Sequence, residues 1–98
     1  MLTGKKVLVI GLAKSGKAAV RLLKKLNATI TINEFQEASK IPEYQQYLDD
    51  GIEMITGGHP DELFERDFDF VIKNPWINYH KPFILRLKER NIPVYTEI

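Results

Sequence analysis

Two kinds of segment alternate along the chain. Short apolar runs rich in β-branched residues, typical of strands buried in a parallel sheet, alternate with stretches whose apolar positions recur every three or four residues, as in helices. The expected strands are residues 7–10, 28–33, 52–55, 68–72 and 93–96, and the expected helices are 16–26, a short one from 42 to 48, a turn around 63–64, and 82–90.

Strands that alternate with helical connections predict an α/β fold. Right-handed crossovers favour a parallel five-stranded sheet covered on both faces, a three-layer Rossmann-like arrangement with the probable strand order 3-2-1-4-5. With 98 residues the chain is expected to form one domain over residues 1–98. Ligands of such sheets bind at the carboxyl ends of the strands, beside the point where the strand order reverses. Function is therefore expected in the loops after strands one, two and four.

Composition narrows the range of partners. The formal net charge is +1 and there is no cysteine, so we expect no nucleic-acid partner, no disulfide and no thiolate metal site. The apolar run Val7–Ile10 is too short for a signal peptide or a membrane span, which predicts a cytoplasmic protein without a membrane partner. His59 and His80 are isolated in the sequence, and no metal site is expected.

The turn after the first strand is the most informative stretch. Gly11 permits a tight turn, Ala13 keeps the backbone close to a ligand, and Gly16 lets the following helix approach the sheet. Backbone N–H groups at a helix start, together with the helix dipole, favour a phosphate. Lys14 and Lys17 are expected to add positive charge there.

The same turn differs from an ATP-hydrolysing loop. Ala18 stands where a Walker A loop carries the hydroxyl that binds Mg²⁺, so ATP hydrolysis is not expected at this turn. Ser15 is expected to cap the helix that follows.

An acidic residue, Glu34, closes the second strand. About 20 residues after a glycine turn, such an acid is placed to bind the ribose hydroxyls of a dinucleotide. It is equally suited to a pyrimidine N–H, or to solvent. One alternative is therefore a small NAD-binding domain that uses Gly11, Ala13, Gly16 and Glu34.

Four segments of the chain together resemble a known family. They are residues 7–26 (VLVIGLAKSGKAAVRLLKKL), 57–60 (GGHP), 72–75 (IKNP) and 92–98 (IPVYTEI). The chain is similar, over nearly its whole length, to the N-terminal domain of the Gram-positive Mur ligases that add D-glutamate to UDP-N-acetylmuramoyl-L-alanine in peptidoglycan biosynthesis. This resemblance implies a domain that holds the UDP part of a UDP-sugar substrate. It implies that the diphosphate is contacted by Gly11, Lys14, Ser15 and Gly16. It also implies that Glu34 contacts the uracil and that Asn74 and Pro75 line the uridine site.

The resemblance also implies where the chemistry lies. The ATP-binding loop, the Mg²⁺ ligands and the carbamylated lysine of the family belong to a central domain outside these residues. No catalytic residue and no cofactor are therefore expected within this chain, which is not expected to act as a ligase alone.

The loop after the fourth strand departs from the family pattern. Trp76 stands where the family has Gly, and Asn78 where it has Pro, so an indole is expected to crowd the uridine pocket. Large aromatic side chains are also typical of protein-binding hot spots. A second alternative is therefore a re-surfaced or engineered scaffold that binds a protein partner through the Trp76 loop, with Phe35, Trp76, Tyr79 and His80.

Overall fold

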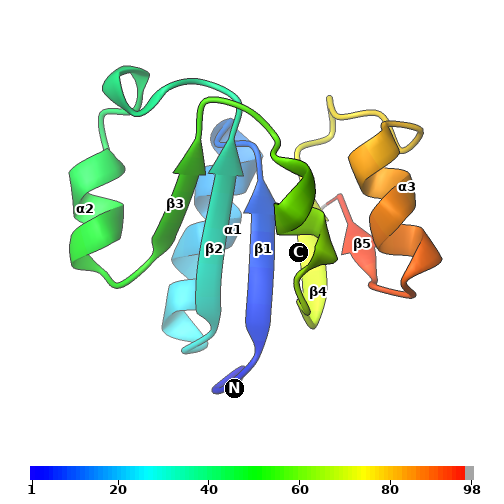
Figure 1. The fold of residues 1–98 in the computed structure, drawn as a ribbon. Helices are drawn as coiled ribbons and strands as arrows, with labels where there is room; N and C mark the ends of the chain where they lie inside the picture. Colours follow the sequence, from blue (N-terminus) through cyan, green and yellow to red (C-terminus); the bar gives the residue numbers. More distant parts are fainter. Residues whose placement is uncertain (97–98) are drawn as a thin grey trace.

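The computed structural model describes residues 1–96, in which strands and helical segments alternate along the chain (Figure 1). The strands are β1 (Lys6–Ile10), β2 (Thr29–Glu34), β3 (Glu53–Thr56), β4 (Phe70–Lys73) and β5 (Val94–Tyr95). The α-helices are α1 (Lys14–Lys25), α2 (Tyr44–Asp49) and α3 (Pro82–Glu89), and the 3₁₀ turns are η1 (Ala38–Lys40) and η2 (Asp61–Glu65).

The predicted topology is confirmed. The five strands form one parallel sheet in the order β3-β2-β1-β4-β5. Helix α1 lies behind the sheet and η2 lies in front of it, so both faces are covered (Figure 1). The strand order reverses between β1 and β4, and the carboxyl ends of all five strands meet at one edge.

The core explains why β1 has a continuous apolar sequence. Val7 and Val9 pack into the cluster on the α1 side, whereas Leu8 and Ile10 pack into the cluster on the side of η2 and α3. All four side chains are completely buried, which is the expected state of a central parallel strand with both faces covered. The first strand therefore anchors the turn that follows it.

Several element boundaries differ from the prediction. Helix α1 begins at Lys14, two residues early, because the carbonyl of Ala13 already accepts a hydrogen bond from the N–H of Lys17 (3.0 Å). Ala13 occupies the N-cap position, so the expectation that Ser15 caps the helix is wrong. Strand β4 begins at Phe70 rather than at residue 68, since the Asp69 carboxylate accepts the Lys6 N–H (2.7 Å) at the end of the ladder.

The ends of the other strands differ from the predicted ends by no more than one residue, and β5 contains only two residues. Within residues 1–96, no helix has the length and apolar character needed to cross a membrane.

Candidate functional site

The turn between β1 and α1 depends on two glycines. Gly11 has φ +95°, and a Cβ built on it would lie 2.8 Å from the Cβ of Asn74. A Cβ on Gly16 would overlap the carbonyl oxygen of Gly11. The structure therefore brings together three of the predicted site residues, Gly11, Gly16 and Asn74, and neither glycine position has room for a side chain.

The start of α1 presents backbone donors without partners. Among the hydrogen bonds of the described residues, none uses the backbone N–H of Lys14, Ser15 or Gly16. The helix has no side-chain cap and no acidic residue in its first turn. Unpaired N–H groups at the start of a 12-residue helix, reinforced by its dipole, form a favourable place for an anion.

A hollow of about 410 Å³ opens beside these donors. It is lined by residues 13–15 and 18 from the start of α1 and by residues 74–76 from the loop after β4. It therefore lies between the loops that follow β1 and β4, at the predicted switch point of the sheet. Pro75, another predicted site residue, lies on its wall.

The two lysines near the turn differ in their surroundings. The Lys17 ammonium lies 2.9 Å from the Glu43 carboxylate. This hydrogen bond raises the pKa of Lys17 and lowers that of Glu43, so the positive charge that Lys17 brings to the turn is paired with a carboxylate. Lys14 has no ion pair among residues 1–96 and is exposed. The free positive charge of the turn therefore comes from Lys14.

Glu34 has a role that its position alone did not reveal. Its carboxylate accepts the N–H of Leu12 (2.8 Å) and the N–H of Gln36 (2.8 Å). The N–H of Gly11 also donates to the carbonyl of Asn33 (2.8 Å). The end of β2 thus holds the turn between β1 and α1 in place, and Glu34 contacts this turn at Leu12.

Asn33 and His59 were missed as site residues. Asn33 is fully buried, and its amide nitrogen donates to the carbonyls of Ile55 (3.0 Å) and Gly58 (2.8 Å). Its amide oxygen is consequently the acceptor for Nδ1 of His59 (2.6 Å), which fixes the proton of neutral His59 on Nδ1. Burial lowers the pKa of His59, while the charge of Glu34 opposes this shift.

The sequence did carry a signal that Asn33 needs a polar partner. A polar residue at the last fully buried position of a strand needs a partner, and the Gly57–Pro60 loop follows the neighbouring strand. What the sequence did not reveal was the pairing itself.

The aromatic and histidine residues predicted as a partner surface make no ring contact with one another in the described part of the chain; they are Phe35, Trp76, Tyr79 and His80. Trp76 is 90% exposed and is one of the residues that line the hollow. That its indole crowds the uridine pocket stays a prediction. The backbone N–H of Trp76 donates to the side-chain oxygen of Asn74 (3.0 Å). The ammonium groups of Lys73 and Lys88 lie 4.1 Å and 4.3 Å from the centroid of the Tyr79 ring.

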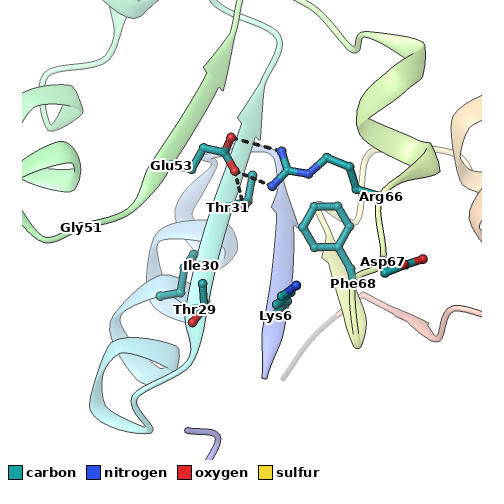
Figure 2. A pocket seen from close by; sticks show the side chains of 9 residues that line it. All are labelled: Lys6, Thr29, Ile30, Thr31, Gly51, Glu53, Arg66, Asp67 and Phe68. Carbon is teal, nitrogen blue, oxygen red and sulfur yellow. Dashed lines mark hydrogen bonds and ion pairs between the residues drawn. The ribbon is translucent and has the colours of Figure 1, made fainter. Parts of the chain in front are cut away.

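A larger hollow, of about 450 Å³, lies away from this edge. Figure 2 shows Arg66 reaching over β1 toward Glu53, whose carboxylate lies beside Thr31 of β2. The guanidinium and carboxylate are paired twice (2.7 and 3.1 Å), and the Thr31 hydroxyl donates to the same carboxylate (3.0 Å). These polar groups satisfy one another, so this hollow offers few free groups to a ligand.

The strand order, the glycine turn and the unpaired amides of α1 define a Rossmann-like α/β domain. The chain belongs to the Mur ligase MurD-like N-terminal domain family, whose model matches residues 5–96. The chain is 48% identical over 97 residues to the UDP-N-acetylmuramoylalanine–D-glutamate ligase of Streptococcus thermophilus (strain ATCC BAA-491 / LMD-9), covering 99% of this chain and 22% of the relative.

Two further ligases of the same name are similar. The Streptococcus sanguinis (strain SK36) protein is 49% identical over 94 residues, and the alignment covers 96% of this chain and 21% of the relative. The Lactiplantibacillus plantarum protein is 50% identical over 93 residues, which is 95% of this chain and 20% of the relative. The chain therefore spans about one fifth of the length of these relatives.

Proposed function

We propose that this chain is the UDP-binding domain of a UDP-N-acetylmuramoylalanine–D-glutamate ligase. It binds the UDP part of the substrate at the carboxyl edge of the sheet. The observation that carries the proposal is the uncapped start of α1, where the N–H groups of Lys14, Ser15 and Gly16 lack partners beside a hollow. Family membership and the printed activity of the relatives support the choice of ligand.

The diphosphate is the part of the ligand that fits this turn. Two phosphate groups accept several hydrogen bonds and carry negative charge, which suits unpaired amides at the positive end of a helix dipole. The exposed ammonium of Lys14 adds a positive charge. Gly11 and Gly16 allow the close packing that shapes this turn, because a Cβ on either would meet Asn74 or the Gly11 carbonyl oxygen.

The two sides of the turn are suited to the two ends of the ligand. Glu34 ties the β2 side of the turn to Leu12, and its remaining acceptor capacity suits a base N–H. Asn74 and Pro75 border the other side, toward β4, where they could contact the ribose of the uridine. We assign this chain a binding role, with no catalytic residue and no cofactor of its own.

The experiment places a carboxylate on the amides. Ala13 occupies the N-cap position of α1 in an extended conformation (φ −70°, ψ −179°), which is suited to an Asp cap. Ala13→Asp is expected to raise the free energy of unfolding by about 0.5–2 kcal/mol. Since the new carboxylate occupies and repels the phosphate position, UDP affinity is expected to fall roughly 10- to 150-fold, the equivalent of one charge-assisted hydrogen bond.

Calorimetric titration with UDP and urea unfolding measure the two effects on the same protein. Ala13→Asn is the matched control, because it caps the helix without the charge and is expected to reduce UDP affinity less than Ala13→Asp. A stabilised Ala13→Asp protein that binds UDP as tightly as the unmodified chain would refute the diphosphate position. Tighter binding of NAD than of UDP would favour the dinucleotide alternative.

A further inference from the structure

A row of rings leads from the core to the carboxyl edge of the sheet. Phe64 is 1% exposed and stacks on Phe83, with ring centroids 4.9 Å apart. Phe83 in turn lies 4.5 Å from the His59 ring, and His59 lies 6.0 Å from the ring of Phe35. The row ends at Phe35, which is 70% exposed. One aromatic face is thus presented to solvent at this edge.

The row is held in place by polar contacts beneath it. Asn33, fully buried at the end of β2, binds Nδ1 of His59 (2.6 Å) and the carbonyl of Gly58 (2.8 Å). The N–H of Gly57 donates to the carbonyls of Glu34 (3.1 Å) and Gln36 (3.0 Å), which flank Phe35 in sequence. The segment that carries Phe35 is therefore tied to the loop that carries His59.

Phe35 also lies next to the nucleotide turn. It follows Glu34, whose carboxylate accepts the N–H of Leu12, two residues before α1 begins. A nucleotide whose diphosphate rests on α1 and whose base extends toward β2 would reach this segment. A flat apolar face at that position suits a planar base, since bases stack on aromatic rings.

We propose that the exposed ring of Phe35 is a base-stacking residue, which contacts the uracil of the bound nucleotide. This inference rests on the proposed UDP-binding function. It assigns Phe35 to ligand binding, in place of the protein-partner surface to which the sequence alone assigned it. The edge of the base remains free for acceptors such as Glu34.

The test compares two ligands that differ in having a base. UDP and inorganic pyrophosphate are titrated calorimetrically into the 98-residue chain and into Phe35→Ala. Loss of one base–aromatic stack is expected to weaken UDP binding roughly 5- to 150-fold, whereas pyrophosphate binding changes less than about twofold. Phe35→Trp, which keeps a flat ring, is expected to retain UDP affinity.

Phe35→Leu is the matched control, because it keeps apolar bulk and removes the flat ring; UDP binding is expected to fall nearly as far as in Phe35→Ala. The inference is overturned if either Phe35→Ala or Phe35→Leu binds UDP as tightly as the unmodified chain. It is also overturned if Phe35→Ala weakens pyrophosphate binding to the same degree as UDP binding. If the unmodified chain binds neither ligand, it is the proposed function that fails. If the unmodified chain binds UDP no more tightly than pyrophosphate, only the stacking contact is overturned.

Discussion

Gly16 shows how one position can reverse an ordinary propensity. Inside a helix, replacing Gly by Ala normally stabilises by about 1 kcal/mol. At Gly16 the added Cβ would overlap the backbone carbonyl oxygen of Gly11. The backbone at Gly11 and at Gly16 could move apart only if the turn opened. We expect Gly16→Ala to lower the free energy of unfolding by about 1–3 kcal/mol, measured by urea denaturation.

The neighbouring residue gives the control for this prediction. Ser15 is exposed and caps nothing, so Ser15→Ala is expected to change stability by less than about 0.5 kcal/mol. An unfolding free energy for Gly16→Ala equal to or above that of the unmodified chain would show that the turn relaxes and does not need the glycine.

Residue-level prediction from the sequence succeeded where a single backbone requirement decides the residue type. The glycines of the turn are of this kind, as the φ of +95° at Gly11 shows. It fell short where a side chain has several possible partners. Glu34 was predicted to face a ligand or solvent, yet its oxygens are bonded to two backbone N–H groups. The contact with Leu12 comes from the register of β1 against β2, which sequence periodicity does not determine.

At the scale of elements, the connection between β3 and β4 is unusual because it contains only the 3₁₀ turn η2. Arginines of and just after α3 hold it in place. Arg90 donates to the carbonyls of Phe64 (2.8 Å) and Arg66 (3.0 Å), and its side chain is 20% exposed. Arg86 forms a two-pronged pair with Glu65 (2.6 Å for both bonds), but both of these side chains are about half exposed.

These two arginines are expected to differ in their contribution to stability. Glu65 raises the pKa of Arg86 strongly, but an exposed pair contributes only about 0–1 kcal/mol because solvent screens it. Arg90→Ala leaves partly buried carbonyls without donors and is expected to cost about 1–3 kcal/mol. Urea unfolding of Arg90→Ala and Arg86→Ala, in low and in high salt, measures both. A larger loss for Arg86→Ala that persists in high salt would contradict this order.

Element type and order could be predicted from the sequence, whereas element ends could not. The alternation of β-branched runs and helical periods determines a parallel sheet almost without regard to side-chain detail. The ends depend on single contacts, such as the bond from Lys6 N–H to the Asp69 carboxylate that precedes β4. The same limit applies to the candidate site: its turn was predicted, but the Asn33–His59 pair that supports its edge required the three-dimensional register of β2 and β3.

At the scale of the whole molecule, the shifted pKa values predict how stability depends on pH. Hydrogen bonds to Lys17, Lys24, Arg66 and Arg86 lower the pKa values of Glu43, Asp50, Glu53 and Glu65, respectively. A carboxyl group with a lowered folded pKa stabilises above its ordinary value of 3.8 or 4.5, and this contribution is lost as the pH falls through the folded value. At the alkaline end, the folded state raises the pKa values of Lys17 and Tyr47, so stability falls as the pH rises through these values.

His59 adds a separate step at higher pH. Burial lowers its pKa below the ordinary 6.5, with Lys81 acting in the same direction and Glu34 opposing it. Between these two pKa values the unfolded chain binds more protons than the folded one, so stability rises with pH through this window and is complete above 6.5. We therefore expect a plateau of stability between about pH 6.5 and 10, with a shallow decline beginning just below 6.5 and a steeper one below about 4.5.

His59→Gln isolates this step. It removes the titrating ring but keeps a side-chain N–H that can donate to Asn33, so the decline just below pH 6.5 is expected to disappear while the acid decline remains. Urea unfolding free energies from pH 4 to 8 measure the difference, and His80→Gln, at an exposed position, is the matched control. The half-buried His59 ring lies in the same row as Phe35. A decline that survives in His59→Gln and disappears in His80→Gln would place the titration outside the candidate site.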